Sequence, residues 1–188
     1  MVNCFFNTPG FAKPPYNLMP INLELKISVT SHQKLKEILK EINAEYKGLL
    51  NQKDIYYSVP DGLLKLRVEN GNESLILYNR NEKAKNRWSD YNLINFRDSG
   101  GEKFFSDVFR TEVVVQKKRE LFIYDNTRIH IDTVKSLGRF LELETLVING
   151  KTDARKRFKK IVELLDINES NQIRKSYRNL LIESKIQK

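Results

Sequence analysis

The chain has 188 residues, a size that suits one domain with a proper core. Its formal charge of +9 and isoelectric point near 9.5 favour an anionic partner, namely a nucleotide, a polyphosphate, a nucleic acid or a membrane surface. A single cysteine, Cys4, excludes an intramolecular disulfide and favours a reducing, cytoplasmic location. No apolar run is long enough to cross a membrane, and a secretory signal is not expected, because the first twenty residues lack a basic region followed by an apolar one.

The first residues precede the first recognisable element. We interpret residues 1–19 as a leader or arm and residues 20–188 as a single domain that includes the C-terminal tail. A strand is expected over residues 21–29. A helix follows, because Thr30 and Gln33 have the spacing of a capping box. Its apolar stripe at helical spacing consists of Leu35, Ile38, Leu39 and Ile42.

Three β-patterns come next, over residues 54–59, 63–69 and 74–80. The turn sequences Pro60-Asp61-Gly62 and Gly71-Asn72 separate them. Short turns between consecutive strands predict an antiparallel meander.

The middle of the chain begins with a polar basic loop over residues 81–90. A strand over 91–96 and a short helical pattern around Phe104 and Phe105 follow. Four further strands are then expected, over residues 112–119, 120–125, 127–134 and 139–148.

A second long helix opens at Gly150 and Thr152 and ends near Asp166. Its apolar stripe consists of Phe158, Ile161, Val162 and Leu165. The basic tail from Ser170 carries Tyr177 at helical spacing from Leu180 and Leu181 and is expected to pack as a short helix.

Charged and aliphatic residues alternate in several of these strands, as in Leu23-Glu24-Leu25-Lys26-Ile27 and Leu141-Glu142-Leu143-Glu144. Successive side chains leave a strand on opposite faces, so the sheet has one aliphatic and one charged face. The charged face would carry Glu24, Lys26, Lys65, Arg67, Lys117, Arg119, Arg128, Asp132, Glu142 and Glu144.

The position of the helices bears on whether this charged face is open or enclosed. A solvated outer face is the simpler interpretation, since antiparallel sheets often have one. Both helical stripes, however, need an apolar partner, and the aliphatic sheet face is the only large one. A twisted sheet of about eight strands can then curl until the charged face lines its inside. We therefore predict an α+β fold, an eight-stranded antiparallel β-barrel with helices packed outside.

Pairs two residues apart on one strand could carry chemistry on that face. Glu142 and Glu144, with Glu24 and Asp132 nearby, would suit a hard ion such as Mg²⁺ or Mn²⁺. Two solvated glutamates on an edge strand are the alternative.

The cationic pairs Lys65 with Arg67 and Lys117 with Arg119 have the same geometry and could clamp phosphate oxygens. Surface ion pairs are the alternative for them.

Other motifs favour simpler roles. The loop residues Lys83, Lys85, Arg87 and Trp88 are candidates for nucleic-acid contact. The run Arg155-Lys156-Arg157 is better explained as a solvated helix face, and without a recognised binding motif a nucleic acid is not the expected partner.

The sequence has two histidines, His32 and His130, and they do not have the spacing of a zinc-binding motif. His130 lies between Arg128 and Asp132 on the charged face and could contact a ligand, but we favour a structural role. Neither a Gly-x-Ser-x-Gly elbow nor a Walker loop occurs.

In order and spacing, five segments together resemble the CYTH superfamily, which contains class IV adenylyl cyclases, thiamine triphosphatases and other triphosphate tunnel metalloenzymes. They are Asn22-Leu23-Glu24-Leu25-Lys26, Gln52-Lys53-Asp54-Ile55-Tyr56-Tyr57, Gly62-Leu63-Leu64-Lys65-Leu66-Arg67, Thr127-Arg128-Ile129-His130-Ile131-Asp132 and Leu137-Gly138-Arg139-Phe140-Leu141-Glu142-Leu143-Glu144. The closing Ser176-Tyr177-Arg178-Asn179-Leu180-Leu181 is similar to the tail of class IV cyclases.

The resemblance implies an eight-stranded triphosphate tunnel and a role for each inward charge. The implied metal ligands for Mg²⁺ or Mn²⁺ are Glu24, Asp132, Glu142 and Glu144. The implied triphosphate-binding residues are Lys26, Lys65, Arg67, Arg80, Lys117, Arg119 and Arg128, and the implied catalytic residues are Glu24, Lys26, Lys117 and Arg119.

The implied activity is that of a class IV adenylyl cyclase, which converts ATP to cyclic AMP and pyrophosphate. The alternatives are hydrolysis of thiamine triphosphate or inorganic triphosphate, and a non-catalytic module that binds nucleotide or polyphosphate. Two departures bear on turnover: Asn22 stands where the family signature has its first Glu, and Leu63 stands where many relatives have Arg.

Overall fold

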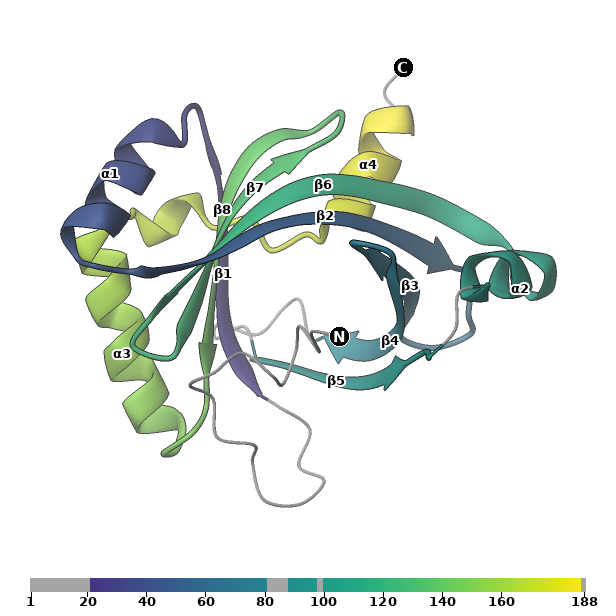
Figure 1. Ribbon diagram of the computed structural model, residues 1–188, viewed down its shortest axis with the longest axis horizontal. Coiled ribbons are helices and arrows are strands. Elements are labelled where there is room, and N and C mark those ends of the chain that lie inside the picture. Colours follow the sequence, from purple (N-terminus) through teal and green to yellow (C-terminus); the bar gives the residue numbers. More distant parts are fainter. Residues whose placement is uncertain (1–20, 81–87, 98–99, 187–188) are drawn as a thin grey trace.

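The computed structural model describes residues 21–80, 88–97 and 100–186. Its eight strands form a closed antiparallel barrel in the order β1-β5-β4-β3-β2-β6-β7-β8 (Figure 1), which confirms the predicted barrel. The pairs Asn22 with Ser89 and Leu23 with Trp88 join β1 to β5 and close the ring. The strands are β1 (Asn22–Val29), β2 (Glu45–Tyr57), β3 (Leu63–Glu69), β4 (Asn72–Arg80), β5 (Trp88–Asn95), β6 (Thr111–Tyr124), β7 (Thr127–Val134) and β8 (Gly138–Leu146).

The first three helices of the described residues pack on the outside of the barrel, and the C-terminal helix lies at one of its ends (Figure 1). The helices in the described residues are α1 (Gln33–Glu41), α2 (Gly101–Val108), α3 (Lys151–Leu164), the 3-10 turn η1 (Glu169–Asn171) and α4 (Tyr177–Ile186). α1 and α3 flank the wall made by β1, β7 and β8, α2 lies at the opposite end of the molecule, and α4 packs on β6. Within the described part of the chain, no helix combines the length and apolar character needed to cross a membrane.

The main core lies between this wall and the helices, outside the barrel. Leu25, Ile129 and Leu141 from the aliphatic sheet face pack with Leu39 of α1 and Ile161 of α3, and all five are nearly inaccessible to water. Burying an aliphatic side chain of this size contributes about 1.5 to 3 kcal/mol, so these contacts hold the charged face inward. The helical stripes therefore cover the aliphatic face, as predicted.

Two strands are longer than the sequence predicted. β2 begins at Glu45 rather than near residue 54, because its first half pairs with the end of β6. This half lacks the usual alternation of buried and exposed residues, and Tyr46 and Leu49 are exposed. β6 runs unbroken from Thr111 to Tyr124, and the expected division after Arg119 is wrong. No turn-forming residue interrupts that segment, and β2 pairs along its whole length.

The predicted capping box at Thr30 and Gln33 is also wrong. α1 is capped at His32, and the Gln33 backbone N–H donates to Ser31 Oγ at 3.2 Å. The cap therefore lies two residues later than the spacing indicated.

Candidate functional site: the lumen of the barrel

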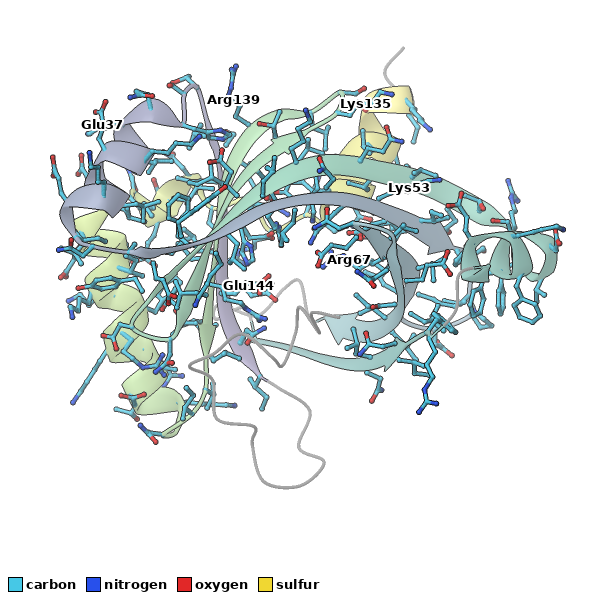
Figure 2. All side chains as sticks on the ribbon, viewed as in Figure 1. Glu37, Lys53, Arg67, Lys135, Arg139 and Glu144 are labelled. Carbon is cyan, nitrogen blue, oxygen red and sulfur yellow. The ribbon has the colours of Figure 1, made fainter. Side chains whose placement is uncertain are left out.

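The charged residues of alternate positions point into the barrel and line a cavity of about 120 Å³. Figure 2 shows Arg67 and Glu144 inside the ring of strands, while Glu37 and Lys135 lie outside it. Of the residues predicted for the site, Glu24, Lys26, Lys65, Arg67, Lys117, Arg119, Arg128, Glu142 and Glu144 line this cavity. Four of the predicted features lie outside the described part of the chain: the Arg80 side chain, residues 83–87, the Trp88 side chain and residues 1–19, which the sequence analysis interpreted as a leader or arm.

The acidic wall of the lumen consists of Glu24, Glu142 and Glu144 on the neighbouring strands β1 and β8. Strand register brings them together, because Glu24 pairs with Glu144 and Lys26 pairs with Glu142. On the other side of β8, the register places Arg128 beside Glu144. Glu142 and Glu144 thus each have a cationic neighbour on an adjacent strand, whereas Glu24 lies opposite Glu144.

Two arginines hold the carboxylates of this region. Arg119 lies 2.6 Å from Glu142 and also donates to Asp132 at 2.6 and 2.7 Å, while Arg128 lies 2.8 Å from Glu144. Burial raises the pKa of Glu142, but Arg119 and Lys26 outweigh it and bring that pKa to about 2. These side chains are therefore ionised at neutral pH.

The cationic wall consists of Lys65, Arg67 and Lys117 on β3 and β6, gathered around Asp54 of β2. Arg67 donates to the two Asp54 oxygens at 2.7 and 2.8 Å, Lys65 donates to Oδ2 at 3.0 Å, and Lys117 lies 3.8 Å from Oδ2. Burial, reinforced by Arg67 and opposed by Asp54, lowers the pKa of Lys65 to about 7. The sequence analysis gave Asp54 no role; its signal was a carboxylate alternating with the inward Gln52 and Tyr56.

The C-terminal tail closes one end of the lumen. Towards that end, the inward rows of β6, β7 and β8 change from charged residues to Val115, Val134 and Phe140, which pack with Tyr177 and Leu181 of α4. Lys26 Nζ donates to the Lys175 carbonyl, and the Tyr177 ring lies 4.5 Å from Lys26 Nζ and 5.2 Å from Lys117 Nζ. The sequence analysis expected a packed tail but not its entry into the site.

The oxygen-rich acidic wall fits a hard divalent ion in its donor chemistry. Three carboxylates share one face of two adjacent strands, and the buried Asn22 Oδ1 at the head of β1 has no hydrogen-bond partner among the described residues. With the carboxylates turned toward arginines, no three Asp, Glu, His or Cys side chains of the described residues are gathered as a metal site. Asp132 lies deeper, fully buried on Arg119 and Tyr177, and its role as a metal ligand stays a prediction.

Two further residues differ from or extend the sequence interpretation. Arg157 is not a solvated helix residue: it is buried and donates to the carbonyls of Asp125 and Leu146, which anchors α3 to the barrel. His130 lines the lumen with Nε2 3.5 Å from Glu144, so it is available to a ligand as well as to its neighbours.

Comparison with known proteins gives matches along most of the chain. A family model described as the CYTH domain matches residues 20–177. A protein of Methanocaldococcus jannaschii named "Putative adenylate cyclase" is 28% identical over 172 residues, which cover 85% of this chain and 98% of the relative. 

Two solved structures show the same fold. One, from Pyrococcus horikoshii, has a TM-score of 0.75 and 21% identity and covers 85% of this chain and 98% of its own. The other, from Hippeastrum, has a TM-score of 0.65 and 11% identity, covers 88% and 96%, and is described as a "Putative adenylyl cyclase" with a dominant triphosphatase activity.

Proposed function

The chain belongs to the CYTH domain family, and on this premise we propose that it is a divalent-metal-dependent enzyme acting on the triphosphate of a nucleotide or a related compound. The observation that carries the proposal is the lumen itself, where a cationic wall and an acidic wall face one cavity. A polyphosphate needs fixed cations around its oxygens, and its reaction is accelerated by charges already in place before the transition state.

The basic and the acidic side chains of the lumen would bind different groups. Lys26, Lys65, Arg67, Lys117, Arg119 and Arg128 would bind the phosphate oxygens. Glu24, Glu142 and Glu144, with Asp132 behind them, would hold Mg²⁺ or Mn²⁺. When bound, such an ion supplies charge neutralisation of phosphate oxygens. Arg119 and Arg128 would then release carboxylate oxygens and turn toward phosphate.

We favour adenylyl cyclase chemistry, in which the ribose 3′-hydroxyl attacks the α-phosphate and pyrophosphate leaves. Support comes from the tail at Tyr177, which lies in the site, and from the name carried by the Methanocaldococcus jannaschii relative. The second candidate is a triphosphatase, in which water attacks the terminal phosphate. The activity described for the Hippeastrum protein supports it.

A product assay separates the candidates. The protein is incubated with ATP, thiamine triphosphate and inorganic triphosphate, each with Mg²⁺ or Mn²⁺, and the products are separated. Cyclic AMP with pyrophosphate identifies a cyclase, and orthophosphate identifies a triphosphatase. Lys117→Met should abolish either activity. The control is Lys135→Met, which replaces an exposed lysine outside the barrel (Figure 2) and should leave the activity unchanged.

Two other outcomes would replace the enzyme proposal. Triphosphate binding without turnover of any substrate would indicate a non-catalytic module. Salt-sensitive binding to a nucleic acid that excess triphosphate does not displace would indicate a nucleic-acid-binding protein driven by the net charge of +9. The cytoplasmic location inferred from the single Cys4 is part of the proposal as well.

A further inference from the structure

Asp54 lies at the centre of the cationic wall and is only 1% exposed. A carboxylate has about four acceptor positions, and here Arg67 takes two and Lys65 takes a third. Lys117, at 3.8 Å, adds an attraction without a hydrogen bond. One carboxylate on β2 therefore organises cations from two other strands.

The role of this carboxylate is unusual for a polyanion site, because its charge repels the proposed ligand. Without Asp54, however, three buried cations would face one another directly. Arg67 cannot relieve that repulsion, since a guanidinium keeps its proton in proteins. A lysine would do so by losing its proton, and the wall would lose one charge.

Lys65 is a lysine whose pKa lies close to neutral pH. Burial and the neighbouring Arg67 lower its pKa to about 7 even though Asp54 and its hydrogen bond act in the opposite direction. The groups that face Lys65 and its cluster are Asp54 and the Tyr56 ring on β2, Arg67 and Glu69 on β3, Lys117 and Arg119 on β6 and Asp132 on β7. Asp54 is the carboxylate among them that contacts Lys65.

We propose that Asp54 is a positioning residue of the cationic wall, whose carboxylate favours the charged form of Lys65 and holds Lys65 and Arg67 in place for a polyphosphate. The inference rests on the proposed function for its ligand. Its electrostatic part concerns the protein alone and is tested without any ligand.

The first test is an NMR titration of the Lys65 ammonium in the wild type and in Asp54→Asn, with Lys65→Gln used to assign the signal. The variant keeps the size of the side chain and removes its charge. We expect the titration midpoint of Lys65 to fall by at least about one pH unit, while Asp107→Asn, which removes an exposed partner of Lys103, leaves it unchanged. An unchanged midpoint in Asp54→Asn would overturn the inference.

The second test measures binding of inorganic triphosphate by calorimetry between pH 5.5 and pH 8.5, with thermal melting to verify folding. At pH 5.5 Asp54→Asn should bind nearly as tightly as the wild type, because a fall of about one unit leaves most of Lys65 charged and a repelling carboxylate is gone. At pH 7.5 the variant should bind about tenfold more weakly for each unit by which the Lys65 pKa has fallen. Lys65→Gln should lose this pH dependence.

The two possible failures are distinguishable. Parallel pH profiles for the wild type and Asp54→Asn would overturn the positioning role. If the wild type binds no triphosphate at any pH, the proposed function fails, and the Lys65 titration still decides whether Asp54 controls the charge of the wall.

Discussion

The Tyr177 hydroxyl donates a hydrogen bond of 2.9 Å to Asp132 Oδ2, the same oxygen that accepts from Arg119 at 2.6 Å. The Tyr177 ring also packs on Phe140 with centroids 5.0 Å apart. The first residue of α4 is thus bound to the interior of the barrel, so the tail and the ion pairs of the lumen form one structural unit.

Tyr177→Phe is expected to destabilise the protein and to reduce turnover. The change keeps the ring beside Lys26 and Lys117 but removes a donor to a buried carboxylate, a loss of about 1 to 3 kcal/mol in unfolding free energy. Urea denaturation measures the first effect and the product assay the second. Tyr46→Phe, at a position 53% exposed, is the matched control and should change neither. Equal stability of Tyr177→Phe and the wild type would contradict the role of the hydroxyl.

The unfolding free energy should fall as the pH drops from about 4.5 to about 2. Burial raises the pKa of Glu142, but Arg119 and Lys26 bring it down to about 2, and the pKa of Asp54 also lies well below its ordinary value. In this window the unfolded chain binds protons that the folded chain does not, so stability is lost on acidification. Glu142 alone accounts for about 3 kcal/mol at most. Urea denaturation at pH 3 and pH 6 tests this, and equal free energies would refute it.

Sequence alternation was sufficient to predict which charged side chains of β1, β3, β6, β7 and β8 face the inside of the barrel. In pairs such as Lys65 with Arg67 and Glu142 with Glu144, aliphatic neighbours on both sides set the face of the strand. The helical stripes at Leu39 and Ile161 then determined which face turns outward. Period and amphipathicity are local properties, and for this reason they can be read from one sequence.

The partners of these side chains could not be read in that way. Asp132 is bound by Arg119 on a neighbouring strand and by Tyr177 from the C-terminal helix, and strand register and the path of the tail decide both contacts. Asp54 alternates with Gln52 and Tyr56, but the charged Lys53 between them hides which face of the strand turns inward. Its central place on the cationic wall appears only once β2 is paired with β3 and β6. Nor does any local signal mark the first half of β2, because Gly48 and the adjacent Leu49 and Leu50 interrupt the alternation of apolar and polar residues.

Arg119→Lys should inactivate the protein even though the charge is conserved. The guanidinium joins Asp132 to Glu142 through two of its nitrogens, and an ammonium cannot reproduce that fork. Loss of one partner of a buried ion pair lowers the free energy of unfolding by about 3 to 5 kcal/mol, and we expect a smaller decrease here because the charge is kept. We expect kcat/KM to fall by about 100-fold or more.

Arg139→Lys, at an exposed position of β8, is the control for the same chemical change. Denaturation and steady-state kinetics are measured on both variants. Activity of Arg119→Lys within a factor of a few of the wild type would mean that Arg119 contributes charge alone.

Asn22→Glu should strengthen metal binding. Asn22 is 2% exposed at the head of β1 and lies on the same face as Glu24, two residues away. A carboxylate at this position adds an anionic ligand for the metal. Without metal, it places a like charge beside the acidic wall, so the variant should be less stable than the wild type in the presence of a chelator. With Mg²⁺ or Mn²⁺ the order should reverse, because an ion that binds the folded state stabilises it.

The neutral Asn22→Gln is the matched control, since it lengthens the side chain without adding charge. Thermal melting with and without Mn²⁺, calorimetric Mn²⁺ binding and the product assay are applied to all three proteins. We expect Asn22→Glu to bind Mn²⁺ at least about tenfold more tightly and to turn over triphosphate faster. A metal affinity equal to that of Asn22→Gln would place the ion out of reach of residue 22 and contradict this prediction.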